Sequence, residues 1–182
     1  MARLPYLDQE DLPAEDRVLL TRDINLYKAL AHNTAALRAF SGLGQYIRHR
    51  TTLDARLREL AILQVGWLAR SPYEWSHHIK IGQDFGVTDA DIEALVAESQ
   101  GEATALEPLA RLVLQAAREI HAGPGVGYAT FAALRAAMDE RSIMDLVITA
   151  GFYCAVVRVL ASLEIDVEEA YLPYLRRHPL PL

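Results

Sequence analysis

Apolar residues recur at intervals of three and four along nearly the whole chain, and this spacing constrains the fold more than any other feature. The spacing places apolar side chains on one face of an α-helix, whereas a half-buried strand would need strict alternation. No Val/Ile/Thr-rich run bounded by a two-residue turn predicts a hairpin. The sequence therefore predicts an all-α protein, a helical bundle in which one core serves all 182 residues.

Two consecutive helices have the clearest boundaries. The first, Asp54 to Arg70, has an apolar centre (LAILQVGWL) on nearly every side, so we expect it in the middle of the domain. The second begins at Ser71 as N-cap, with Pro72 at its first position and Glu74 closing a capping box, and it ends near Gly86. Further helices are predicted from near Pro13, from Asn33 toward Arg50, after Thr88, and over about 106–121, 130–138 and 139–163.

The two most apolar helices carry more hydrophobic surface than a small domain can cover, which predicts a homo-oligomer. The longest apolar run, 146–157, is interrupted by Thr149 and is shorter than the roughly 20 residues of a membrane span. It is therefore expected to be a buried helix. The first residues have no apolar signal-peptide core, so we expect a cytoplasmic protein.

Charge and cysteine content exclude several classes of function. The net charge is −6 and no Lys/Arg-rich run is present, which disfavours nucleic acid and anionic membranes as partners. The one cysteine, Cys154, lies inside the apolar run, so neither an intrachain disulfide nor a dithiol redox pair can form. We expect a small-molecule substrate and further copies of this chain as partners.

Chemistry-bearing side chains concentrate around the junction of the two central helices. Glu74 and His78 are four residues apart and face the same side of one helix, while His77 lies one residue further round. Glu59 lies on the preceding helix, and two antiparallel helices joined at Ser71 would bring it toward this pair. The sequence thus predicts an imidazole held between carboxylates.

The segments RELAIL (58–63) and YEWSHH (73–78) resemble the carboxymuconolactone decarboxylase and AhpD-like superfamily. The resemblance spans residues 53–95 and implies a single domain over 1–182, with an N-terminal arm at 1–12 and assembly into trimers or hexamers. In the peroxidase branch of that superfamily, a glutamate, a C-x-x-C pair and a histidine follow one another at fixed spacing. Counting from Glu59 gives Ser71, Glu74 and His78 at these positions, which indicates a thiol-free branch.

Replacement of both thiols turns the expected chemistry from peroxide reduction to proton transfer, because one thiol must attack and the other resolve the product. The resemblance implies a cofactor-independent and metal-independent acid/base enzyme, a decarboxylase, lyase or isomerase acting on a small carboxylate or lactone. In this interpretation His78 moves a proton at the reacting carbon, Glu59 orients the imidazole and Glu74 extends the relay. One of the two carboxylates should have a raised pKa and serve as the acid.

Three further residues are predicted to contact the substrate. Tyr73 and His77 flank the Glu74 position on the same helix. Arg158 lies in an apolar helix and must find an anion, which is either Asp145, Glu164 or a substrate carboxylate.

Other interpretations remain open at this point. Glu74 could serve only as a helix cap, and Glu59 only as a first-turn acid that complements its helix dipole. A metal site could use Glu59, Glu74, His77 and His78, although adjacent histidines on one helix do not point at one ion without strain. A non-catalytic oligomer that binds a small apolar acid would have the same sequence features.

Overall fold

The computed structural model describes residues 2–181, and every regular element in that range is helical, which confirms the all-α class. The α-helices are α1 (Asn25–Leu30), α2 (Thr34–His49), α3 (Ala55–Leu68), α4 (Pro72–Asp84), α5 (Asp89–Ser99), α6 (Pro108–Ala122), α7 (Tyr128–Ala137), α8 (Glu140–Leu163) and α9 (Leu172–Arg177). Short 3₁₀ helices are η1 (Gln9–Asp11), η2 (Arg17–Leu20), η3 (Ala31–Asn33) and η4 (Glu169–Tyr171).

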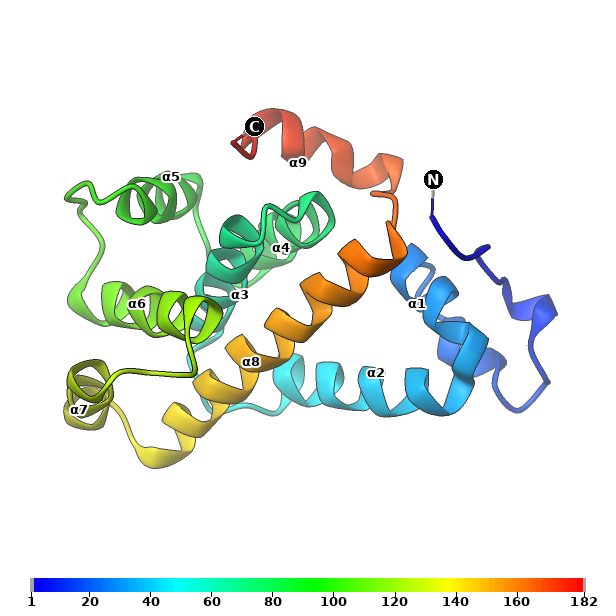
Figure 1. Ribbon diagram of the computed structural model, residues 1–182, viewed down its shortest axis with the longest axis horizontal. Coiled ribbons are helices and arrows are strands. Elements are labelled where there is room, and N and C mark those ends of the chain that lie inside the picture. Colours follow the sequence, from blue (N-terminus) through cyan, green and yellow to red (C-terminus); the bar gives the residue numbers. More distant parts are fainter. Residues whose placement is uncertain (1, 182) are drawn as a thin grey trace.

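Helix α3 forms the centre of the domain, as its apolar sequence predicts. It packs against α4, α6 and α8, and all residues from Leu57 to Trp67 are buried (Figure 1). The side chain of Asp54 caps its first turn by accepting a hydrogen bond from Leu57 N at 3.0 Å. The helix ends two residues earlier than expected, and Arg70, with a φ of 48°, turns the chain sharply toward α4.

The α3–α4 turn departs from the predicted capping box in one respect. Ser71 Oγ accepts a hydrogen bond from Glu74 N at 3.4 Å, and Pro72 occupies the first turn as expected. The backbone N–H of Ser71, however, donates to Gly66 O at 3.0 Å instead of to the Glu74 carboxylate. The Glu74 side chain is thereby left for another role. A Cβ on Gly66 would lie 3.3 Å from Trp75 N, so glycine allows the two helices to approach closely.

Helix α8 is 24 residues long and confirms the predicted helix over 139–163, with Asp139 as its N-cap. By length and mean hydropathy alone it could cross a membrane, although a core helix has the same properties, and in this structure it packs on α3 and α6. Only 44% of its most apolar window is buried, and Met144 is 57% exposed. An apolar face of α8 is therefore uncovered in the single chain.

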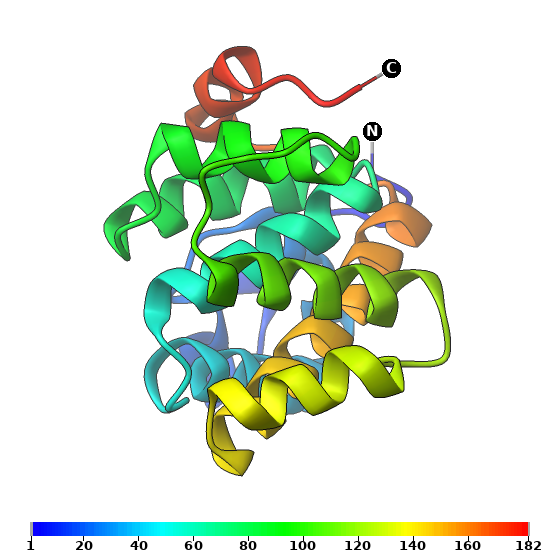
Figure 2. The ribbon, with the colours of Figure 1, turned by 90° about the vertical axis from the view of Figure 1, so that its left-hand side faces the viewer.

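The two ends of the chain pack on different helices, η2 on α1 and α2, and α9 on α4. The prediction of an α-helix that begins near Pro13 is wrong. The chain there forms only the short 3₁₀ helix η2 at Arg17–Leu20, and the segment around it is irregular. At the other end, α9 crosses the α4 side of the bundle (Figure 2), and Trp75 Nε1 donates to His178 O at 2.7 Å. The C-terminal helix thus closes over the outer face of α4.

Candidate active site

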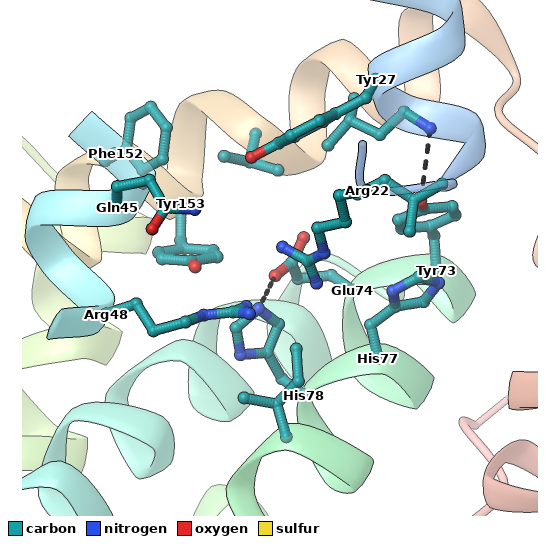
Figure 3. A pocket seen from close by; sticks show the side chains of 15 residues that line it. Arg22, Tyr27, Gln45, Arg48, Tyr73, Glu74, His77, His78, Phe152 and Tyr153 are labelled. Carbon is teal, nitrogen blue, oxygen red and sulfur yellow. Dashed lines mark hydrogen bonds and ion pairs between the residues drawn. The ribbon is translucent and has the colours of Figure 1, made fainter. Parts of the chain in front are cut away.

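A small cavity of about 50 Å³ lies where α1, the segment before it, α2, α4 and α8 meet (Figure 3). It is large enough for a few water molecules. Polar side chains from all of these segments line it: Arg22, Gln45, Arg48, Tyr73, Glu74, His77, His78 and Tyr153. Of the predicted catalytic residues, Glu74 and His78 line this cavity and Glu59 lies directly behind them.

Glu59 and His78 meet across the α3–α4 helix pair. The antiparallel course of these helices from Ser71 brings Glu59 Oε2 to 2.7 Å from His78 Nδ1. Both side chains are buried. A hydrogen bond to Nδ1 fixes the ring's orientation and leaves Nε2 directed at the opposite side.

The second oxygen of Glu59 is held by Arg58, a buried arginine. Its Nε and Nη2 both donate to Glu59 Oε1, at 3.0 Å and 2.9 Å, and its guanidinium stacks over the Phe85 ring at 4.6 Å. Burial alone would raise the pKa of Glu59, but the positive charges of His78 and Arg58 outweigh it and lower the pKa. Glu59 is therefore an ionised anchor, and it does not have the raised pKa that we expected of one carboxylate.

Glu74 lies on the far side of the same imidazole. Its Oε1 is 3.0 Å from His78 Nε2, within ion-pair distance, yet this oxygen is buried and has no aligned hydrogen-bond partner in residues 2–181. Burial alone would lower the pKa of His78, whereas Glu74 and Glu59 together raise it. The two carboxylates thus favour the protonated form of the His78 imidazole, and Glu74 is the one of them that faces the cavity (Figure 3).

Tyr73 and His77 also line the cavity, but their polar atoms bind Glu168, which precedes η4. His77 Nε2 is 2.7 Å from Glu168 Oε2, and the Tyr73 hydroxyl donates to Oε1 at 3.0 Å. The His77 ring stacks between Tyr73 and Tyr171, with centroids 4.0 Å and 3.5 Å away. Burial lowers the pKa of His77 despite the carboxylate. These two residues form a wall of the cavity with their hydrogen-bonding capacity already used.

The structure does not bring Arg158 to the cavity. Arg158 is exposed on α8, and its guanidinium donates to the carbonyl of Cys154 one turn earlier. The candidate partner Asp145 is engaged elsewhere, with Tyr46 Oη at 2.7 Å and Thr52 N at 2.7 Å. An arginine on the uncovered face of α8 needs no buried anion, so the reason for placing it at the substrate no longer applies.

Arg22, Arg48 and Tyr153 are among the lining residues that were not predicted as site residues. Arg22 lies in the irregular segment before α1, and Arg48 lies in the last turn of α2, where a cation is explained by the helix dipole. Tyr153 on α8 contacts His78 edge to face, with ring centroids 5.0 Å apart. The spacing of these three residues in the sequence does not link them to Glu59 or His78. They reach the same cavity only because the segments that carry them pack together in the folded chain.

The candidate metal ligands do not converge. His77 points to Glu168, away from the Glu59–His78 pair, and residues 2–181 contain no group of three or more His, Cys, Asp or Glu side chains arranged to hold a metal ion. Cys154 is buried beside Arg158 and outside the cavity lining, and burial raises the pKa of its thiol. A raised pKa makes a thiol a poor nucleophile.

Comparison with solved structures shows a shared fold. A peroxidase-related protein of uncharacterised function from Ralstonia eutropha JMP134, described as an alkylhydroperoxidase AhpD core, has a TM-score of 0.80 and 20% identity, covering 96% of this chain and 95% of that one. A peroxidase-related protein from Silicibacter sp. TM1040 has a TM-score of 0.78 and 21% identity, with 93% of each chain covered. The debrominase Bmp8 in complex with 2,3,4-tribromopyrrole has a TM-score of 0.78 and 17% identity, covering 97% and 99%.

At these identities the likeness establishes the fold alone. No curated protein sequence matches the chain. The sequence itself matches the carboxymuconolactone decarboxylase family over residues 34–119, a range that includes Glu59, Glu74 and His78. The chain is therefore similar to the carboxymuconolactone decarboxylase family over just under half of its length, and it shares its all-α fold with the AhpD core structure.

Proposed function

We propose that this chain is a cofactor-independent acid/base enzyme of a thiol-free branch of this family, with a proton relay of Glu74, His78 and Glu59. The main support is the position of His78 between two carboxylates, at 2.7 Å and 3.0 Å, beside a cavity. A charged imidazole that can pass a proton to a facing carboxylate is a common device of general acid–base catalysis. The fixed Glu59–Arg58 pair supplies the orientation that such a relay requires.

In this proposal Glu74 is the group that exchanges a proton with the substrate. Both ring nitrogens of His78 face carboxylates, so the imidazolium acts through Glu74. In a decarboxylation the carbon–carboxylate bond breaks, CO₂ leaves, and the electron pair left on carbon takes a proton that His78 supplies through Glu74. In an isomerisation Glu74 removes a proton from one carbon and returns it to another. The small cavity suits a small carboxylate or lactone.

The placement of Glu74 argues against a purely structural role for these groups. Its side chain is buried, does not return to the Ser71 N–H as a helix cap, and lies 3.0 Å from His78 Nε2 at the cavity. A thiol peroxidase is disfavoured because the chain has one cysteine and its thiol is remote from the cavity. A non-catalytic ligand binder is the second candidate, and the observation that supports it is that Glu59, Tyr73 and His77 are already engaged in hydrogen bonds within the chain.

Proton exchange tests the proposal directly, because any substrate that takes a proton from the relay or gives one to it gains deuterium in D₂O. A panel of small unsaturated carboxylates and lactones is incubated with the enzyme in D₂O, and ¹H NMR follows deuterium incorporation and loss of the carboxylate. We expect turnover with the unmodified chain and a decrease by a factor of about 100 or more in Glu74→Gln. A control variant, Lys80→Gln, alters an exposed ion pair on the same helix and keeps full activity. Equal rates in Glu74→Gln and the unmodified chain would contradict the relay.

A further inference from the structure

Two arginines face the cavity without an anionic partner. Arg22 and Arg48 both line it, and within residues 2–181 neither guanidinium makes an ion pair or hydrogen bond. The Arg22 guanidinium lies over the Tyr27 ring, 5.9 Å from its centroid. Both side chains are partly buried. Partly buried guanidinium groups that line a cavity attract anions strongly, because water screens their charge less than at the surface.

Both guanidinium groups interact electrostatically with the phenol of Tyr153, whose pKa is raised above all by burial. Tyr153 is 8% exposed, and its hydroxyl has no hydrogen-bond partner in the described part of the chain. An O–H group and two guanidinium groups that make no hydrogen bond in the described residues therefore lie around the cavity beside Glu74 and His78 (Figure 3).

The charges around the cavity are unequal. Among the side chains that line the cavity, Arg22 and Arg48 are the arginines, and Glu74, the one carboxylate, already lies within ion-pair distance of His78. The cavity therefore has an excess of positive charge, although the chain as a whole has a net charge of −6. An anion brought between the arginines would relieve their mutual repulsion and supply the acceptors that Tyr153 and both guanidinium groups need.

We propose that Arg22, Arg48 and Tyr153 form a carboxylate-binding subsite that determines which substrates enter the cavity. The planar fork of a guanidinium matches the two oxygens of a carboxylate, and the Tyr153 hydroxyl donates a third hydrogen bond. When the carboxylate is bound in this way, the remainder of the molecule extends toward Glu74, and this part of the proposal rests on the proposed function. Anion binding itself requires no turnover, so the two proposals are tested separately.

Propionate and its neutral isostere propionamide are the probes, because they share shape and differ in charge. Saturation-transfer difference NMR at constant ionic strength measures the Kd of each for the unmodified chain. We expect propionate to bind at least about tenfold more tightly than propionamide. Arg22→Gln and Arg48→Gln are each expected to weaken propionate binding about tenfold, with propionamide unaffected. Tyr153→Phe is expected to weaken it by a smaller factor, since one hydrogen bond is lost.

Arg158→Gln is the matched control, because it removes an arginine that is exposed on α8 and outside the cavity. Circular dichroism confirms that each variant is folded before binding is measured. Equal affinity for propionate and propionamide, or unchanged propionate binding in the Arg22→Gln/Arg48→Gln double variant, would overturn the subsite. Full competition by chloride at the same concentration would also overturn the assignment to a carboxylate. Glu74→Gln should bind propionate at least as tightly as the unmodified chain, which distinguishes loss of the relay from loss of the subsite.

Discussion

Replacing Glu59 by glutamine removes the negative charge that lies between Arg58 and His78. In the unmodified chain each oxygen of this carboxylate binds a cation, Arg58 at 2.9 Å and His78 at 2.7 Å. Arg58 is 3% exposed, so the substitution leaves a buried guanidinium without its counterion. Breaking a buried pair in this way costs about 3–5 kcal/mol. The amide oxygen of glutamine still accepts a hydrogen bond, so we expect the lower end, about 3 kcal/mol.

The pH dependence of this loss follows from the two pKa shifts. The pKa of Glu59 is lowered from 4.5, so the stability it contributes is present above that value and is lost as the pH falls through the folded pKa. The pKa of His78 is raised from 6.5, so its contribution is present below that value and is lost as the pH rises through the folded pKa. The difference between the unmodified chain and Glu59→Gln should therefore be greatest between these two values.

Thermal and urea denaturation, followed by circular dichroism from pH 3 to pH 9, measure this difference. For a domain of this size, about 3 kcal/mol corresponds to a decrease in Tm of roughly 6–12 °C. The matched control is Glu107→Gln, which removes a carboxylate that also binds an arginine, Arg56 at 2.6 Å, but is 48% exposed. Its effect should stay below about 1 kcal/mol. A loss in Glu59→Gln that equals the control, or that does not vary with pH, would refute the buried charge relay.

Three other substitutions test the surroundings of the site. Glu168→Gln leaves three hydrogen-bond donors with a weaker acceptor and should lower the free energy of unfolding by about 1–3 kcal/mol, measured in urea; an unchanged midpoint would show that this contact contributes little. Met144→Lys places a charge on the uncovered apolar face of α8 and should reduce the mass of the expected homo-oligomer in light scattering; a monomeric unmodified chain would contradict that expectation. Gly66→Val meets Trp75 N and should destabilise by about 1–3 kcal/mol, whereas Gly42→Ala, in open space, should not.

The sequence was most informative where structure depends on neighbours along the chain. The caps at Asn33, Ser71 and Thr88 all form, with side-chain oxygens accepting hydrogen bonds from the backbone three residues later. The position of α3 in the centre follows from its apolar surface on all sides. These features are local or nearly so, because a cap needs one turn and a buried helix needs no particular partner.

Contacts between distant parts of the chain account for what could not be predicted. Glu168 is 91 residues from His77 in the sequence, and no periodicity or spacing links the two. Arg22 and Arg48 reach the cavity only because α1 and α2 pack against α4 and α8. Arg158 shows the opposite case, since an arginine in an apolar helix indicated a buried anion, whereas the helix face that carries it is exposed.

The turn between α3 and α4 explains how the same glutamate can satisfy the pattern of a cap and still serve a reaction. In a full capping box the Glu74 side chain would return to the N–H of Ser71. Here that N–H binds Gly66 O, which is possible because the close α3–α4 approach continues the hydrogen bonding of α3 into the turn. Ser71 still caps α4, while the Glu74 carboxylate turns to His78. The sharp turn that makes the helix pair therefore also frees the acid that faces the cavity.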